Sequence, residues 1–227
     1  MNETIDWLGK PYYSLNAYFK HTYGQKIYKI AVDAGLTCPN RDGSLDSRGC
    51  IFCSAGGSGD FAVEVGAGTN EPMKCLKKFN KSVGDKFVIY FQAFTNTYGD
   101  IEYLRKIWSE ALSLDNVVGI SIATRPDCLG DEVIALLQEL SLAFPDKLLW
   151  VELGLQTIHP ETARYIRRGY PLSVFEDAAR KLTSINVPYI VHVILGLPGE
   201  SDEDVAETID KIIPLAPDSL TVHSLAI

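Results

Sequence analysis

The chain has 227 residues, 46% of them hydrophobic and 22% charged, and a formal net charge of −8. These values are typical of one globular domain with a substantial core and exclude a disordered chain. No apolar run reaches the roughly 18 residues of a membrane helix, and the N-terminus has no signal-peptide pattern. Five cysteines, an odd number, argue against a disulfide framework, so we expect a cytoplasmic protein without a membrane partner.

Apolar runs that alternate with helical patterns organise the chain. Residues 1–25 are rich in aromatic side chains and predict a short entry segment that packs on a core domain, which spans 26–227. The predicted strands are 26–32, 86–92, 117–123, 148–154, 189–195 and 219–224. The predicted helices are 71–82, 100–113, 131–143, 160–168, 172–185 and 202–213.

The predicted strands are nearly continuous apolar runs, and helices separate them. This pattern is typical of an α/β fold in which a parallel sheet is covered by helices. Six repeats are too few for a closed eight-fold barrel. The sequence therefore predicts an open (βα)6 partial TIM barrel that is truncated after strand six.

Three cysteines lie close together on the long loop that follows the first predicted strand. Cys38, Cys50 and Cys53 have the spacing Cys-x11-Cys-x2-Cys, and glycines and a proline mark the segment 34–60 as a loop. A closed zinc site takes four protein ligands, and a [4Fe–4S] cluster normally takes four cysteines. Three thiolates would leave one iron open to a substrate or cofactor. The alternatives are buried thiols, or a zinc site that a distant Cys or His completes.

This loop resembles the cluster loop of radical SAM enzymes, with an aromatic residue, Phe52, just before the last cysteine. The long first gap is similar to that of the Elongator-like branch, and Tyr12 to Asp60 resembles the bacterial YtqA/YhcC-type proteins. The resemblance implies a radical SAM type of partial barrel, with a [4Fe–4S] cluster on the three cysteines. It also implies an enzyme that reductively cleaves S-adenosyl-L-methionine (SAM) to a 5′-deoxyadenosyl radical. The electron would come from an external donor such as flavodoxin or ferredoxin.

Polar residues recur where the predicted strands end, and the carboxyl ends of parallel strands share one edge. By the resemblance, Gln92 stands where the family binds the methionine amino group, although the usual Gly-Gly-Glu is absent. Arg125 is expected to pair with the SAM carboxylate, because a guanidinium matches a carboxylate bidentately. Glu152 is expected to bind the ribose hydroxyls, with help from Gln156. Taken singly, each is better explained as a satisfied polar residue at a strand end, but together with the cysteine loop at the same edge they favour a binding site.

The adenine of SAM needs a flat apolar surface and close backbone contacts. Phe52 is expected to pack on the adenine, and Gly196 and Gly199 would let the backbone approach it. Cys128 lies near the same edge and is a candidate for a redox role, whereas Cys75 is expected to be a buried thiol. His192 and His223 alternate with apolar residues, so we expect them in the core or the cavity wall.

The substrate is the least constrained part of the prediction. Kinship to Elongator implies tRNA, with the wobble uridine side chain changed from carboxymethylaminomethyl to aminomethyl. The candidate phosphate contacts are Arg164, Arg167, Arg168, Lys74, Lys77, Lys78 and Lys81. Ordinary solvated helix charges explain each group about equally well, and the acidic balance leaves a small-molecule or protein substrate as the alternative. A non-catalytic, zinc-stabilised α/β binding module is the alternative of a different class.

Overall fold

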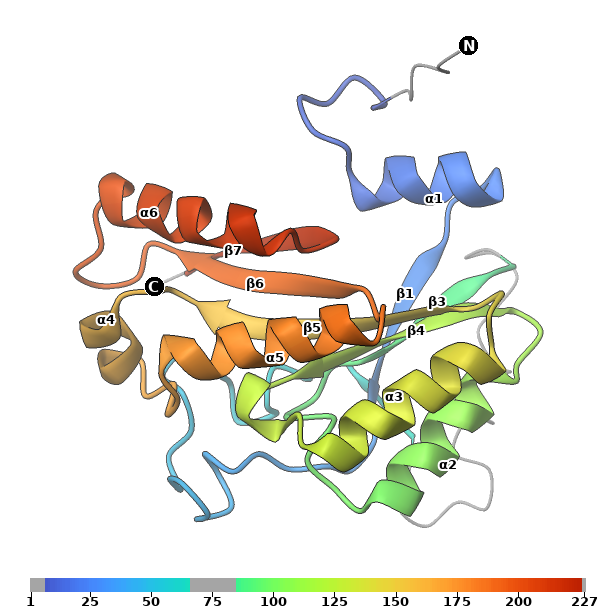
Figure 1. Ribbon diagram of the computed structural model, residues 1–227, viewed down its shortest axis with the longest axis horizontal. Coiled ribbons are helices and arrows are strands. Elements are labelled where there is room, and N and C mark those ends of the chain that lie inside the picture. Colours follow the sequence, from blue (N-terminus) through green and yellow to red (C-terminus); the bar gives the residue numbers. More distant parts are fainter. Residues whose placement is uncertain (1–6, 66–84, 226–227) are drawn as a thin grey trace.

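A single parallel sheet of seven strands forms the centre of the protein (Figure 1). The computed structural model describes residues 7–65 and 85–225. Every neighbouring pair of strands is parallel, in the order β2-β1-β3-β4-β5-β6-β7. The strands are β1 (Tyr28–Asp33), β2 (Val63–Glu64), β3 (Phe87–Phe91), β4 (Val117–Thr124), β5 (Leu148–Gln156), β6 (Tyr189–Leu195) and β7 (Ser219–Ser224). Because β2 and β7 lie at opposite edges, the sheet is not closed, and the predicted partial barrel is confirmed.

The helices follow the strands as the sequence pattern predicts. They are α1 (Leu15–Tyr23), α2 (Ile101–Leu112), α3 (Asp131–Ala143), α4 (Pro160–Tyr165), α5 (Leu172–Ser184) and α6 (Asp202–Ile212). All six predicted strands are present, and the two-residue β2 is an addition at one edge. The helix predicted at 71–82 lies outside the described residues. The helix predicted at 160–168 ends at Tyr165, because Arg167 adopts a left-handed φ of 57°.

The outer face of the sheet carries the main hydrophobic core. Helices α2, α3 and α5 cover this face, and their apolar stripes pack against alternate strand residues. The largest fully buried side chains there include Trp108, Phe91, Phe175, Ile89 and Ile120. Asp100 caps α2 by accepting a hydrogen bond from the Tyr103 amide at 2.9 Å, so the helix begins at the end of the β3 loop. Among the described residues, no helix is long and apolar enough to cross a membrane.

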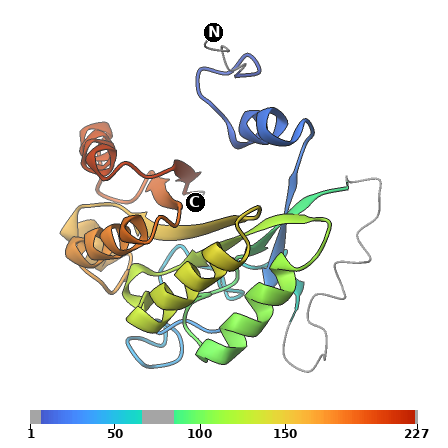
Figure 2. The ribbon, with the colours of Figure 1, turned by 45° about the vertical axis from the view of Figure 1, so that its right-hand side comes forward.

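Helix α1 lies on the opposite, inner face of the sheet (Figures 1 and 2). Its Phe19 side chain packs among Val88, Val118, Trp150 and Ile190, and the Phe19 and Trp150 rings stack with centroids 6.0 Å apart. These four residues lie in the amino-terminal halves of their strands. Helix α1 therefore covers the amino-terminal end of the barrel interior, at the opposite end from the carboxyl ends of the strands.

Candidate functional site

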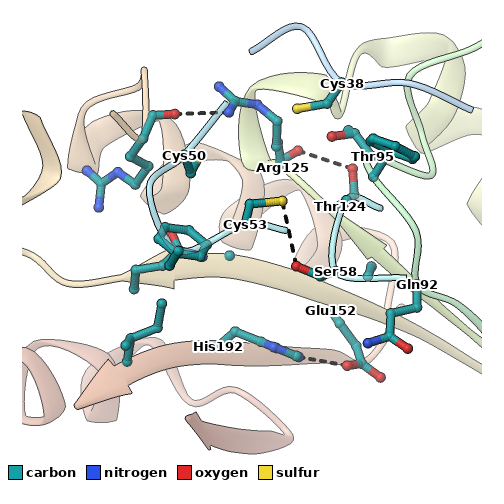
Figure 3. A pocket seen from close by; sticks show the side chains of 18 of the residues that line it. Cys38, Cys50, Cys53, Ser58, Gln92, Thr95, Thr124, Arg125, Glu152 and His192 are labelled. Atoms are coloured by element: carbon teal, nitrogen blue, oxygen red, sulfur yellow. Dashed lines mark hydrogen bonds and ion pairs between the residues drawn. The ribbon is translucent and has the colours of Figure 1, made fainter. Parts of the chain in front are cut away.

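A cavity of about 390 Å³ lies inside the partial barrel at the carboxyl ends of the strands (Figure 3). The cysteine loop forms one wall. The inner faces of the strands from β3 to β7 and the segments that follow them form the rest, together with Arg168 and Tyr170 after α4. The predicted site residues that it brings together are Cys38, Cys50, Phe52, Cys53, Gln92, Arg125, Glu152 and Gln156. Gly196 and Gly199 do not line it; Ile194, Ser224 and Leu225 do.

Arg41 fixes the course of the cysteine loop. Its Nη2 donates to the carbonyl oxygens of Cys53, at 2.9 Å, and of Ser54. The Arg41 side chain passes over Gly49, whose φ is 75°, and a Cβ at that position would lie 2.8 Å from Arg41 Nε. Glycine is therefore needed here both for the backbone angle and for the close approach of Arg41. The result is a loop that carries Cys50 and Cys53 at a fixed place.

Hydrogen-bond donors point at two of the three sulfurs. Asn40, which is buried, donates from Nδ2 to Cys50 Sγ at 3.3 Å and to the carbonyl oxygens of Arg167 and Arg168 at 2.8 and 3.2 Å. Ser58 Oγ donates to Cys53 Sγ at 3.7 Å. Donors of this kind stabilise negative charge on sulfur, as a metal-bound thiolate requires.

The donor set fits a polynuclear iron–sulfur cluster better than one zinc ion. Cys38, Cys50 and Cys53 are free thiols that face one cavity. Among the described residues, only His159, Asp204 and Glu207 bring three ligand atoms within 4.8 Å of one another, so the three sulfurs are spread more widely. Tetrahedral zinc with Zn–S bonds of about 2.3 Å holds its sulfurs about 3.8 Å apart. A larger cluster suits the wider spacing.

Glu152 is the centre of a polar network below the cysteines. The side chain is 2% exposed and accepts hydrogen bonds from Lys29 Nζ, Ser121 Oγ and His192 Nε2, the last at 2.7 Å. Burial raises the pKa of the Glu152 carboxyl, but the bonds from His192 and the charge of Lys29 outweigh it and lower this pKa to about 2. The two Glu152 oxygens therefore accept hydrogen bonds from three donors of the protein itself, and a ribose hydroxyl would be a further donor.

The network continues from Glu152 toward the edge strand β7. Because a carboxylate only accepts, His192 Nε2 carries the proton, and His192 Nδ1 lies 2.9 Å from His223 Nε2. Burial, with the neighbouring His192, lowers the pKa of His223. Both histidines line the cavity, which confirms the expectation of a wall position. Sequence reasoning missed Lys29 and Ser121, although each is a polar residue within an apolar strand.

Tyr90 connects this network to the cavity wall. Its ring lines the cavity, and Lys29 Nζ lies 3.8 Å from the ring centroid. Burial and the nearby Glu152 carboxylate raise the pKa of the Tyr90 hydroxyl, which stays protonated. Gln92 follows two residues later and points into the same space (Figure 3). This side of the cavity therefore offers neutral hydrogen-bonding groups.

Arg125 is already engaged by a carboxylate of the protein itself. Its Nε and Nη2 donate to the two oxygens of Asp127 at 2.9 and 2.7 Å, and Nη1 donates to the Arg168 carbonyl at 2.9 Å. Burial lowers the pKa of the Arg125 guanidinium, but Asp127 outweighs it and the pKa is raised. The bidentate partner that we expected SAM to supply is thus Asp127, and Arg125 joins the end of β4 to the segment after α4.

Arg168 is not a surface residue, and its assignment as a phosphate contact is wrong. The side chain is 2% exposed and donates to the carbonyl oxygens of Leu155, Thr157 and Tyr170, with Nη1 distances of 2.7 and 2.6 Å to the first two. These bonds hold the irregular end of β5.

Arg164 is exposed but pairs with Glu161. The four candidate lysines Lys74, Lys77, Lys78 and Lys81, and Cys75, lie outside the described residues.

Cys128 lies on the turn after β4, away from the cavity lining. Burial, together with Asp127, raises the pKa of its thiol to about 12, so the sulfur is protonated and a weak nucleophile at neutral pH. The structure therefore gives no support to a redox role for Cys128.

Gly196 and Gly199 have φ angles of 78° and 89°, and a Cβ at either position would meet no other atom within 4 Å.

Comparisons with known proteins agree with this geometry. Residues 47–212 match the Radical SAM superfamily. The chain is 41% identical over 221 residues to the protein YtqA of Bacillus subtilis, covering 95% of this chain and 67% of YtqA. It is 32% identical over 207 residues to the protein YhcC of Escherichia coli, covering 90% of this chain and 65% of YhcC. The chain thus spans about two thirds of the length of these relatives.

A solved structure shares the fold. The archaeal Elp3 of Methanocaldococcus infernus superposes with a TM-score of 0.58 at 20% identity, over 88% of this chain and 46% of Elp3. At this identity the similarity concerns the fold alone. It agrees with the open parallel sheet seen in this chain.

Proposed function

Because the chain belongs to the radical SAM superfamily, as a relative of YtqA and YhcC, we propose that it is a tRNA-modifying enzyme with a [4Fe–4S] cluster on Cys38, Cys50 and Cys53. The observation that carries the proposal is that these three thiols face one cavity at the carboxyl edge of a parallel sheet. These three thiolates would hold the cluster, and the chemistry it would supply when reduced by an external donor is the one-electron reductive cleavage of SAM to methionine and a 5′-deoxyadenosyl radical.

The residues around the sulfurs have two tasks in this proposal. Asn40 and Ser58 donate hydrogen bonds to Cys50 and Cys53, which stabilises the thiolate ligands and makes the cluster easier to reduce. Arg41 holds the loop in place through the Cys53 and Ser54 carbonyl groups. The cavity volume lies within the range of small-molecule and cofactor sites.

The walls of the cavity divide the remaining SAM contacts between an apolar and a polar side. Phe52 lies in a small apolar cluster with Ile194 and Leu225, and we assign this side to the adenine. Gln92 is assigned to the methionine end. Glu152 contributes through the network that it forms with Lys29, while Arg125 positions the segment that receives the Asn40 hydrogen bonds.

The proposed substrate is the wobble uridine of tRNA, whose carboxymethylaminomethyl side chain would become aminomethyl. Support comes from the long Cys38–Cys50 gap, which resembles the Elongator-like branch, and from the fold shared with Elp3. A small-molecule or protein substrate is the second candidate, and the net charge of −8 favours it.

The test is to incubate the reconstituted protein with tRNA that carries the carboxymethylaminomethyl group, and to analyse the nucleosides by mass spectrometry. We expect the aminomethyl nucleoside to accumulate only with SAM and reductant, and not with the Cys50→Ala variant. Formation of 5′-deoxyadenosine without any change in the nucleosides would refute tRNA as the substrate while leaving the radical chemistry intact.

A further inference from the structure

The first described segment of the chain has an unusual charge. Residues 7–32 contain four lysines and no aspartate or glutamate, in a protein with 29 acidic residues and a net charge of −8. Three of these lysines, Lys10, Lys20 and Lys26, are exposed and lie in residues 7–26, which we call the N-terminal arm. The arm includes α1. It is thus a locally basic surface on an acidic protein.

The arm lysines are not neutralised by carboxylates. Within the described part of the chain, Lys10, Lys20 and Lys26 form no ion pair, whereas Lys181 and Lys211 on the outer helices do. Lys10 Nζ instead donates to the Tyr12 hydroxyl at 3.3 Å, and Lys26 Nζ lies 4.4 Å from the Tyr28 ring centroid. Their charge is therefore available to an anionic partner.

Aromatic rings accompany these lysines at the surface. Trp7, Tyr12 and Tyr13 have 45%, 56% and 36% of their surface exposed. Exposed rings interleaved with lysines are the combination that binds single-stranded or looped RNA, because bases stack on the rings and lysines neutralise the phosphates. An acidic protein partner would use the lysines but leave the rings without a specific role.

The arm borders the cavity on the same face of the sheet. Phe19 of α1 packs on Val88, Trp150 and Ile190. Two residues further along the same strands, and on the same face, are the cavity residues Tyr90, Glu152 and His192. Two strand residues span about 7 Å, so one layer of side chains separates the arm from the cavity. Figures 1 and 2 show α1 over this inner face, opposite α2 and α3.

We propose that the N-terminal arm is the surface on which the RNA substrate docks, with Lys10, Lys20 and Lys26 on phosphates and Trp7, Tyr12 and Tyr13 on unpaired bases. The inference rests on the proposed function and adds the docking site to it. RNA held on the arm would lie one layer of side chains away from the cavity that the cysteines face.

The test measures binding of a fluorescein-labelled tRNA transcript to the full chain by anisotropy, between about 50 and 200 mM salt. In the variant Lys10→Gln/Lys20→Gln/Lys26→Gln, we expect at least a ten-fold loss of affinity at low salt. The slope of log affinity against log salt should fall by about 2, since each lost phosphate contact removes about 0.7 to 0.9. In the variant Trp7→Ala/Tyr12→Ala, affinity should fall about ten-fold with an unchanged slope, because stacking is not electrostatic.

The matched control removes the same charge elsewhere. Lys106→Gln/Arg180→Gln/Lys211→Gln changes three exposed cations on α2, α5 and α6, and it should retain the affinity and slope of the unmodified chain. Equal losses in the arm and control variants would overturn the arm as the docking surface, with tRNA binding still established. No salt-dependent tRNA binding by the unmodified chain would overturn the RNA substrate itself. If the arm variants lose binding to phosphatidylglycerol vesicles but keep their affinity for tRNA, the arm is a lipid-binding surface and the proposal is overturned.

Discussion

Replacing Glu152 with glutamine tests the polar network beneath the cysteines. The Glu152 side chain is 2% exposed and is the ion-pair partner of Lys29, whose side chain is 24% exposed. A pKa lowered from 4.5 to about 2 corresponds to about 3 kcal/mol of stabilisation at neutral pH. Water that reaches Lys29 reduces the loss, so we expect Glu152→Gln to lower the free energy of unfolding by about 2–3 kcal/mol at pH 7.

The stabilisation by Glu152 should depend on pH and disappear in acid. Because the folded-state pKa of Glu152 lies below its unfolded value, the stabilisation is fully present above about pH 4.5 and is lost as the pH falls through about 2. Urea unfolding of the metal-free protein at several pH values should show a gap between the unmodified chain and the variant that narrows in acid. The double variant Lys29→Met/Glu152→Gln should lose less than the sum of the single variants. A gap below about 1 kcal/mol at pH 7, or one independent of pH, would refute the reasoning.

Three further predictions concern other buried polar groups. Arg168→Met removes the side-chain donor of three buried carbonyl oxygens, of which, within the described residues, only that of Leu155 keeps a second donor, the Thr157 amide. The free energy of unfolding measured in urea should therefore fall by about 2–4 kcal/mol, and a loss below about 1 kcal/mol would contradict the role given to these bonds. Asn40→Leu removes the donor to Cys50, so the reconstituted protein should keep its iron but show a more negative midpoint potential in a dye-mediated redox titration; an unchanged potential would argue against the hydrogen bond. Cys128 should react with iodoacetamide at least about 100-fold more slowly in the folded protein than in urea, as followed by peptide mass spectrometry, and equal rates would contradict its raised pKa.

The sequence predicts the fold well because the information lies in long local patterns. The apolar runs at β4 and β6 match the observed strands to within one residue, and the stripe of α3 matches its helix. The cysteine loop was recognisable for a similar reason, since its three cysteines lie within 16 residues. Such features depend on near neighbours in the chain.

The interior of the barrel was harder to predict because it depends on how separate strands are placed. Lys29, Glu152 and His192 come from three strands, and no spacing in the sequence shows that they meet. Arg168 was misassigned because the left-handed residue Arg167 ends the helical pattern and turns the Arg168 side chain toward carbonyl groups at the end of β5. Asn40 was missed since its partners lie more than 120 residues away, apart from Cys50.

The most direct test of the account is anaerobic reconstitution with iron and sulfide, followed by dithionite and SAM, with an assay for 5′-deoxyadenosine. We predict a brown protein that forms 5′-deoxyadenosine, and loss of both the cluster and the product when Cys38, Cys50 or Cys53 is replaced by alanine. A colourless protein that binds one zinc ion per chain, unfolds with chelator and forms no 5′-deoxyadenosine would contradict the account.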